Sequence, residues 1–535
     1  SAQPLGCEQA ILLPRLCLLA SISAPATPFT PQLTRMPTAM PSSPLTQLKD
    51  PTLLKTDAPI NGQWVAGASR FDVHDPATGT KLADVANLGP ADAEAAIAAA
   101  NAAWPAWRTK TAKERSIILR KWYDLLMANQ DDLGRIMTAE QGKPLPEAKG
   151  EVAYGASFVE WFAEEAKRVN GETLPQFDNN RRLLVLKQPI GVCAAITPWN
   201  FPLAMITRKV APALAAGCPV VIKPAELTPL TALAAAELAV RAGIPAGVLN
   251  ILSADAANSI AIGKVLCASD VVRHISFTGS TEVGRILMAQ SAPTVKKMSL
   301  ELGGNAPFIV FDDADIDSAV EGAFASKYRN AGQTCVCSNR FYVQEGVYDE
   351  FVAKFAAKVK TAKVGNGFED GVNQGPLIEE AALEKVQRHV DDAVAKGGVV
   401  VTGGKRLQSM GSGQFFEPTV VANATPDMLC AREETFGPFA PVFRFKTEQE
   451  AIAAANNTEF GLASYFYSRD VGRIFRVGEA LEYGMVGINV GILATEHVPF
   501  GGVKQSGLGR EGSHHGMDDY VEIKYLCLGD ILEKQ

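Results

Sequence analysis

Histidine and cysteine are scarce in this chain of 535 residues, which contains six histidines and nine cysteines. Nine cysteines over such a length are too few for a disulfide framework. Cys335 and Cys337 have one residue between them, but no second pair follows at a spacing that would complete four zinc ligands. The sequence therefore predicts no metal site, and any chemistry at Cys335 has to come from the thiol itself.

A basic excess and a long apolar run are also missing. The net charge is −7 and the pI about 5.6, so the chain has no surplus of cations to neutralise nucleic-acid phosphates. The most apolar stretch, residues 10–20, is interrupted by Pro14 and Arg15, and no segment is long and apolar enough to span a bilayer. We therefore expect neither a nucleic-acid partner nor a membrane partner.

Residues 1–49 differ in composition from the rest of the chain. They are rich in Ser, Thr, Pro and Leu, and Glu8 is their only acidic residue. This composition loosely resembles an organelle transit peptide. The alternative is a disordered or spurious extension, because Met36 and Met40 lie just before the globular pattern begins. We expect a cytoplasmic protein, or a mitochondrial one if this segment is a transit peptide.

Short apolar runs alternate with helical patterns after residue 190. Strands are expected at 191–197, 219–223, 248–252 and 274–278, with helices at 203–216, 228–242, 257–267 and 281–290. This alternation predicts a parallel sheet of Rossmann type. A second α/β pattern follows, with strands at 308–311, 340–344, 399–401 and 442–445 and a helix at 316–328.

The predicted fold is therefore α/β with two domains. Residues 50–170 and 191–301 are expected to form a dinucleotide-binding domain, and 302–495 a second, catalytic domain. Residues 181–187 and 520–525 alternate polar and apolar in part, as strands that pair outside both cores would. Residues 171–190 and 512–530 are accordingly predicted to form a small β arm.

The usual G-x-G-x-x-G fingerprint of dinucleotide binding is absent after the first strand of this pattern. Gly279, Ser280 and Gly284 instead follow the fourth strand and open a helix, where free N–H groups suit a pyrophosphate. Lys223 and Glu226 close the second strand, where a carboxylate can bind ribose hydroxyls and would favour NAD over NADP. The alternatives are a plain strand-to-helix turn and a solvated charge pair.

Cys335 follows the segment Gly332-Gln333-Thr334, and Arg329 lies close by in sequence. Glu301, about thirty residues upstream, is followed by Leu302, Gly303 and Gly304. A nucleophilic cysteine with a carboxylate base indicates covalent catalysis through a thioester. The alternative is that Cys335 is a buried structural thiol, the more common state of a free cysteine.

Six motifs in order resemble those of the aldehyde dehydrogenase superfamily. The resemblance runs from about residue 50 to 530, and the motifs are Thr197-Pro198-Trp199-Asn200-Phe201-Pro202, Lys223-Pro224-Ala225-Glu226, Phe277-Thr278-Gly279-Ser280, Glu301-Leu302-Gly303-Gly304, Gly332-Gln333-Thr334-Cys335 and Glu434-Thr435-Phe436-Gly437-Pro438. Three further stretches resemble the subgroup that oxidises succinate semialdehyde: 205–209, 329–337 and 499–511.

The resemblance implies a role for each motif residue. Cys335 would attack the aldehyde carbon, the amide of Asn200 and the Cys335 N–H would bind the oxyanion, and Glu301 would activate the hydrolytic water. Glu434 would hold the nicotinamide ribose of NAD(P), with Phe436 near the ring. The remaining implied cofactor contacts are Thr197, Pro198, Trp199, Lys223, Glu226, Gly279, Ser280 and Gly284.

The implied reaction is oxidation of succinate semialdehyde to succinate, as in 4-aminobutyrate degradation. Arg208 and Arg329 resemble the pair that binds the far carboxylate, and Ser506 would add a hydroxyl. From the residues alone, Arg208 could equally lie on a solvated helix face and Arg329 could be a helix C-terminal cation. Glutarate semialdehyde, or another aldehyde, is an alternative substrate.

Three further expectations accompany this interpretation. Cys337 is a candidate redox partner of Cys335, with a spectator thiol as the alternative. The arm implies a homodimer or homotetramer by resemblance. A catalytically silent homologue that acts as a binding protein is the alternative from another functional class, and the joint presence of Cys335, Glu301 and Asn200 argues against it.

Overall fold

The computed structural model describes residues 43–530, so most of the predicted transit-like or extension segment lies outside the described residues. Residues 43–49, also placed in that segment, pack on the fold. Leu45 and Leu48 are buried, and the backbone N–H of Lys49 donates to Asp132 over 2.9 Å. The packed chain thus begins before the boundary expected at residue 50, because these leucines remove apolar surface from water.

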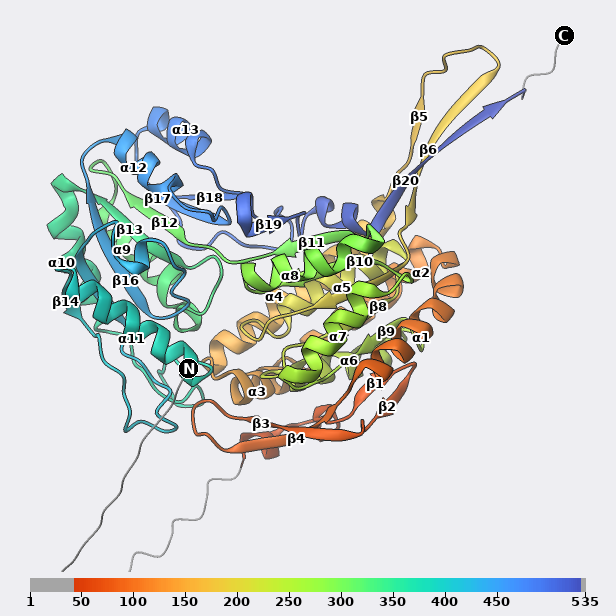
Figure 1. Cartoon of the computed structure of the whole chain (residues 1–535), viewed down its shortest axis with the longest axis horizontal. Coiled ribbons are helices and arrows are strands. Elements are labelled where there is room, and N and C mark those ends of the chain that lie inside the picture. The colour runs from red at the N-terminus through yellow and green to blue at the C-terminus, as the bar shows by residue number, and fades with distance from the viewer. Residues whose placement is uncertain (1–42, 531–535) are drawn as a thin grey trace, which may run out of the picture. The chain divides into compact units, whose positions relative to one another are not determined.

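The first domain is built on a six-stranded sheet of order β19-β11-β10-β7-β8-β9 (Figure 1). All neighbours in it are parallel except β19, which pairs antiparallel with β11. Its strands are β7 (Val192–Ile196), β8 (Val220–Lys223), β9 (Leu249–Ile251), β10 (Val272–Thr278), β11 (Lys297–Glu301) and β19 (Gly507–Leu508). The order of β7 to β11 is 3-2-1-4-5, as the Rossmann pattern predicts.

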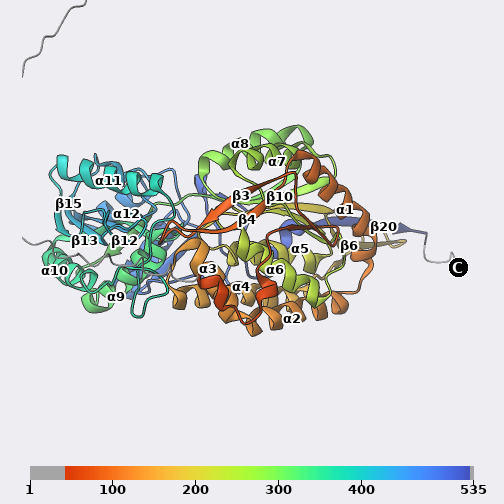
Figure 2. The same cartoon turned by 90° about the horizontal axis from the view of Figure 1, so that it is seen from below.

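Helices cover both faces of this sheet, with α7 and α8 on one side and α5 and α6 on the other (Figure 2). These crossover helices are α5 (Ala204–Ala216), α6 (Pro229–Ala242), α7 (Ala256–Ala268) and α8 (Thr281–Ser291). The preceding segment adds β1 (Ala58–Ile60), β2 (Gln63–Val65), β3 (Ser69–His74), β4 (Lys81–Asn87), α1 (Pro90–Thr109), α2 (Ala112–Ala128), α3 (Gln130–Gln141) and α4 (Leu145–Glu165). Asn61 and Gly62 both have positive φ in the β1–β2 hairpin turn, as an Asn-Gly pair predicts.

The second domain has a seven-stranded sheet of order β14-β15-β16-β13-β12-β17-β18. Its elements are β12 (Ala306–Val310), α9 (Ile316–Tyr328), β13 (Ser338–Gln344), α10 (Tyr348–Val359), α11 (Glu380–Ala395), β14 (Val399–Thr402), β15 (Thr419–Ala424), β16 (Phe439–Phe445), α12 (Glu448–Asn456), β17 (Ala463–Tyr467), α13 (Val471–Ala480) and β18 (Met485–Ile488). Successive residues of β12 face opposite sides, so Phe308 and Ile309 belong to different buried clusters.

A three-stranded antiparallel sheet extends away from both cores (Figure 1). It consists of β5 (Glu172–Leu174), β6 (Arg181–Pro189) and β20 (Val521–Gly529), and β20 pairs with β6 along its whole length. Residues 512–520, predicted as part of the arm, instead lie on the first domain, because Met517 and Tyr520 are buried in its core. Within residues 43–530, no helix is long and apolar enough to cross a membrane.

Candidate active site

The predicted site residues of the first domain lie where its parallel strands end. Asn200 follows β7, Lys223 ends β8, Gly279 follows β10 and Glu301 ends β11. The carboxyl ends of parallel strands meet at one edge of a sheet, which explains why residues far apart in sequence come together. The second domain faces this edge with Cys335 and Glu434, and they complete a cavity of about 340 Å³.

The backbone before Cys335 forms an unusual turn. Asn330, Ala331 and Gly332 all have positive φ, at 52°, 56° and 74°. Two successive non-glycine residues in this region carry backbone strain, which folds retain mostly at functional sites. A Cβ on Gly332 would approach the carbonyl oxygen of Gly437 to 2.3 Å, so glycine is required there. The turn brings Cys335, a half-buried thiol, into the wall of the cavity.

Asn200 is 4% exposed, and its side-chain Nδ2 donates to the carbonyl oxygen of Gln333 over 3.0 Å. A carboxamide nitrogen has two N–H groups, so one donor remains after this bond. Asn200 and Cys335 line the same cavity. The remaining N–H is therefore available as a donor. It could bind a negatively charged oxygen on a carbon atom bonded to the Cys335 sulfur.

Burial disfavours the charged forms of the proposed nucleophile and base of this site. It raises the pKa of the Cys335 thiol to about 12, and the carboxyl of Glu434 adds to that rise while Arg208 opposes it. Burial also raises the pKa of Glu301 well above its ordinary value, with a further contribution from Glu511 and opposition from Lys209. Burial therefore opposes formation of the Cys335 thiolate and of the Glu301 carboxylate, and Glu301 itself lies outside the lining of the cavity.

Trp199, Glu434 and Phe436 form one side of the cavity. The rings of Trp199 and Phe436 meet edge to face, with centroids 5.7 Å apart. The Oε1 atom of Glu434 accepts the backbone N–H of Gly304 over 3.1 Å, and burial raises the pKa of this carboxyl to about 7. An apolar wall beside a fixed carboxylate suits a flat ring that carries a hydroxylated sugar.

The other predicted cofactor residues divide into three groups. Pro198, Gly279 and Ser280 line the cavity, and the Ser280 hydroxyl caps α8 by accepting the Val283 N–H. Thr197, Lys223 and Glu226 lie at the same sheet edge but outside the lining, with Lys223 Nζ 3.0 Å from Glu226 Oε2.

Gly284 alone forms the third group of predicted cofactor residues. Its predicted contact with the cofactor phosphate is wrong. Its N–H is engaged by the Ser280 carbonyl inside the helix. A Cβ at this position would approach Leu302 to 2.6 Å, so this glycine serves close packing between α8 and Leu302.

Arg329 lines a second cavity of about 290 Å³ next to α4. The other lining residues are Lys143, Glu147, Gly150, Glu151, Tyr154, Phe201 and Ala494. The guanidinium of Arg329 lies over the Phe201 ring, 5.0 Å from the centroid. Within residues 43–530, no carboxylate oxygen lies within 4 Å of it. Arg329 is therefore a cation without a carboxylate in ion-pair contact, in a cavity that also holds two aromatic rings and the pair Lys143 and Glu151, and its guanidinium can receive an anion.

Arg208 is 2% exposed, so the solvated-face alternative is wrong. Its guanidinium lies between the rings of Phe158 and Phe500, donates to the Tyr154 hydroxyl and is 3.4 Å from Glu511. Tyr154 lines the Arg329 cavity. Arg208 thus supports one wall of that cavity through Tyr154, and part of its charge is already paired.

The predicted substrate contact of Ser506 is wrong. Ser506 is fully buried, its hydroxyl donates to the Gly303 carbonyl over 2.7 Å, and it accepts the Gly461 N–H over 2.9 Å. Both hydroxyl functions join the segment after Glu301 to the second domain. No donor remains for a ligand.

Sequence reasoning missed a group of charged residues around the start of α4. Lys143 and Glu151 form a buried ion pair of 2.5 Å, and Glu147 Oε2 accepts the Asn330 N–H over 3.0 Å. The available signal was the spacing of Lys143, Glu147 and Glu151, each four residues from the next, which puts the two glutamates on one helix face. The pair of Glu511 with Lys209 was also missed.

Cys337, the predicted redox partner, is 1% exposed. Its Sγ lies 3.3 Å from the ammonium of Lys327, which also donates to Asn339 over 2.9 Å. Cys335 and Cys337 are both free thiols. A disulfide between them stays a prediction.

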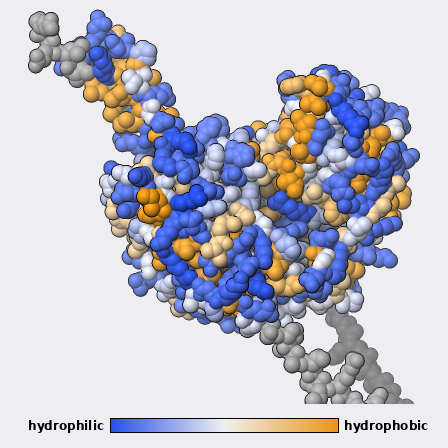
Figure 3. All heavy atoms as spheres, turned by 180° about the vertical axis from the view of Figure 1, so that it is seen from behind, coloured by the Kyte–Doolittle hydropathy of each residue, from blue (hydrophilic) through white to orange (hydrophobic). Residues whose placement is uncertain are grey.

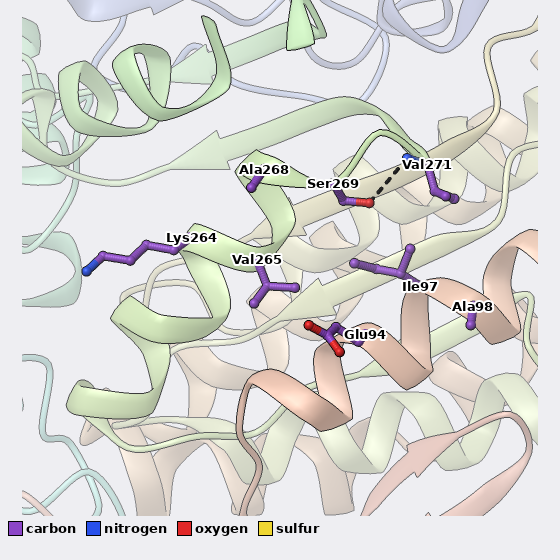
Figure 4. Close-up of a pocket in the computed structure, with 8 residues that line it drawn as sticks. All are labelled: Glu94, Ile97, Ala98, Lys264, Val265, Ala268, Ser269 and Val271. Atoms are coloured by element: carbon purple, nitrogen blue, oxygen red, sulfur yellow. Dashed lines mark hydrogen bonds between the residues drawn. The ribbon is translucent and has the colours of Figure 1, made fainter. Parts of the chain in front are cut away.

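Another groove, of about 560 Å³, lies between α1 and α7 (Figure 4). It is lined by Ile97, Ala98, Val265 and Val271, with Glu94 and Lys264 as its only charged residues. No predicted catalytic or cofactor residue lines it.

Comparison with known proteins agrees with this geometry. The model of the aldehyde dehydrogenase family matches residues 64–526. A glutarate-semialdehyde dehydrogenase of Pseudomonas putida is 60% identical over 90% of this chain and 99% of its own length. An NADP-dependent succinate-semialdehyde dehydrogenase of Escherichia coli is 59% identical over 90% of this chain and all of its own length. The crystal structure of succinate-semialdehyde dehydrogenase from Burkholderia pseudomallei has a TM-score of 0.89 and 64% identity, covering 90% of this chain and 100% of that one.

Proposed function

The chain belongs to the aldehyde dehydrogenase family, and we propose that within it this protein oxidises succinate semialdehyde to succinate with NAD(P) as hydride acceptor. The observation that carries the proposal is Arg329, a cation without a carboxylate in ion-pair contact, in the cavity that begins at Phe201, the residue after Asn200. A semialdehyde of a dicarboxylic acid has an anionic far end, and arginine binds a carboxylate through two parallel hydrogen bonds. An uncharged aldehyde leaves that cation without a partner.

The residues of the first cavity fit a nicotinamide dinucleotide. Trp199 and Phe436 supply the apolar wall, Glu434 is placed to accept from ribose hydroxyls, and the N-terminus of α8 at Ser280 suits the pyrophosphate. When bound, the cofactor takes up a hydride from the substrate carbon. Lys223 and Glu226 at the end of β8 are the proposed contacts for the adenosine end.

The chain's own residues supply the remaining steps. The Cys335 thiol releases its proton to solvent, and the thiolate adds to the aldehyde carbon. The free N–H of Asn200 and the Cys335 backbone N–H hold the oxyanion. After the thioester has formed, Glu301 in its ionised form takes a proton from water, the water oxygen adds to the acyl carbon, and the C–S bond breaks to release the acid and the Cys335 thiolate. The raised pKa of both groups means that these proton transfers depend on what is bound in the cavity.

The test is to follow NAD(P)H formation by purified protein with succinate semialdehyde, glutarate semialdehyde and butanal, each with NAD and with NADP. Selective oxidation of succinate semialdehyde supports the proposal. Equal rates on butanal would remove the arginine argument, and faster oxidation of the five-carbon substrate would favour the glutarate alternative. A protein inactive on all three, as Cys335→Ala should be, would be a silent homologue.

The arm supports a homo-oligomer as part of this proposal. Exposed apolar side chains gather along its sheet (Figure 3), among them Ile523 at 71% and Tyr525 at 53% exposure. Such a surface on a three-stranded sheet is characteristic of an interface between copies. Light scattering should give a dimer or a tetramer, and Ile523→Lys should shift it toward the monomer.

Cys337 is proposed as a redox partner on separate grounds. It is two residues from the nucleophile and a free thiol. Peroxide should inactivate the parent reversibly and Cys337→Ala irreversibly. Identical recovery of both proteins on reduction would leave Cys337 a spectator.

A further inference from the structure

The backbone of Asn200 is fixed by two donors that converge on its carbonyl oxygen. Lys143 Nζ donates to it over 2.8 Å, and Asn330 Nδ2 over 3.0 Å. The Asn200 side chain then reaches Gln333, two residues before the nucleophile. The position of the oxyanion-binding amide therefore depends on groups that themselves never reach the reacting atoms.

Lys143 is in turn held by Glu151. The side chains of this pair are each 1% exposed, and their charged atoms lie 2.5 Å apart. The other carboxylate oxygen of Glu151 accepts the N–H groups of Leu203 at 3.0 Å and Ala204 at 3.3 Å. These are N–H groups at the start of α5, which have no partner inside the helix. Glu151 thus fixes the chain just after Asn200, while Lys143 fixes Asn200 itself.

From this arrangement we infer that Lys143 and Glu151 are positioning residues that set the Asn200 amide for the oxyanion. The inference rests on the proposed function, since it assigns a cause to the placement of a group used there. A buried ion pair gives little net stability compared with apolar residues of the same size. Its bonds to both sides of Asn200 give it a role that stability alone does not explain.

The competing explanation is that the pair only holds α4 against α5. If the role is structural, removal of the pair should lower activity by the same factor whether or not the Asn200 side chain is present. A positioning role acts only through that side chain. The two explanations therefore differ in whether the effect of the pair survives removal of the Asn200 amide.

The test uses Lys143→Met combined with Glu151→Gln, which removes both charges of the pair together. The glutamine carbonyl still accepts from Leu203 and Ala204. This variant should lower kcat/KM for the semialdehyde by about tenfold or more, since small displacements of catalytic groups cost that much. In a protein that already carries Asn200→Ala, the same double substitution should lower kcat/KM by less than about a further twofold. Calorimetric affinity for NAD and the rate at which iodoacetamide labels Cys335 should not change, because neither needs an oxyanion donor.

The matched control is Lys55→Met with Glu237→Gln, a pair of 3.2 Å that joins the segment before β1 to α6 and bonds to no site residue. It should leave kcat/KM unaltered. Equal losses with and without the Asn200 side chain, or no loss at all, would overturn the inference. Should the double variant fail to fold, Lys143→Arg replaces it. This substitution keeps the charge pair and moves the donor away from the Asn200 carbonyl. Its effect on kcat/KM is again compared with and without the Asn200 side chain. If Asn200→Ala itself keeps full activity, the proposed oxyanion role fails, and that result is separate from any behaviour of the pair.

Discussion

The guanidinium of Arg208 lies 3.4 Å from the carboxylate of Glu511, whereas Arg329 has no carboxylate partner among the described residues. The two arginines therefore differ in what they can offer an anionic substrate. Arg329 gains a partner when the substrate binds. Arg208 already has one, and its contacts with Tyr154 and two phenylalanine rings make it part of the wall.

Arg329→Leu should separate charged from uncharged substrates. We expect the KM for succinate semialdehyde to rise about 10- to 100-fold, because the variant loses a charge-assisted hydrogen bond to the substrate carboxylate. The KM for butanal should change less than about twofold. Steady-state kinetics with both aldehydes measures the difference. Arg241→Leu, which removes a surface arginine paired with Asp50, is the control. Equal shifts for both substrates would remove Arg329 from carboxylate binding.

Arg208→Leu should act on stability first. It leaves the Tyr154 hydroxyl without this partner and leaves Glu511 with Lys209 as its remaining cation, which costs about 1–3 kcal/mol of the free energy of unfolding. Urea denaturation followed by fluorescence measures the loss. Adding Glu511→Gln should deepen the loss, because it takes the carboxylate partner away from the buried Lys209. A fully stable Arg208→Leu protein with a selective loss of semialdehyde binding would instead make Arg208 a direct ligand.

Much of the fold was predictable because its pattern is local. The apolar strands β7, β8 and β10 and the helices between them appear in the sequence as buried runs and 3.6-residue periods. The α/β fold and the family resemblance are confirmed. Helix α4 escaped prediction because buried charges at Glu147 and Glu151 interrupt its apolar face, and only the tertiary structure shows their partners.

The errors at the site have a common cause. Ser506 and Gly284 were assigned by their position in a motif, but a motif does not reveal which atoms are already engaged. The Ser506 hydroxyl uses both its donor and its acceptor within the protein. Whether a polar group is free for a ligand depends on contacts far away in sequence, which no local pattern encodes.

Ser506→Ala should therefore lower stability without changing substrate choice. Removal of the hydroxyl leaves the Gly303 carbonyl and the Gly461 N–H unpaired in a dry site, at a cost of about 1–3 kcal/mol. The ratio of kcat/KM for succinate semialdehyde to that for butanal should stay as in the parent. Ser318→Ala, at an exposed serine, is the matched control for thermal unfolding. A selective fall in the semialdehyde ratio would restore the substrate contact.

Cys335 should be labelled slowly at neutral pH and steadily faster as the pH rises. Burial raises the pKa of this thiol to about 12, so the thiolate fraction grows about tenfold per pH unit through the accessible range. A simple thiol such as N-acetylcysteine levels off above about pH 9. Peptide mass spectrometry after timed iodoacetamide treatment gives the rate at Cys335 alone. A plateau below pH 8 would mean that the free protein already holds a thiolate.

Glu226 offers a test of cofactor choice. Its carboxylate lies 3.0 Å from Lys223 Nζ at the end of β8, where the proposed adenosine ribose binds, so a 2′-phosphate there would meet a negative charge. Glu226→Gln keeps the shape and removes that charge, and it frees Lys223 to bind the phosphate. We expect the ratio of kcat/KM for NADP to that for NAD to rise about tenfold, which corresponds to about 1.4 kcal/mol at one screened charge contact. Glu237→Gln, which removes a carboxylate from α6, should leave the ratio alone. An unchanged ratio in Glu226→Gln would show that the ribose end of the cofactor lies elsewhere.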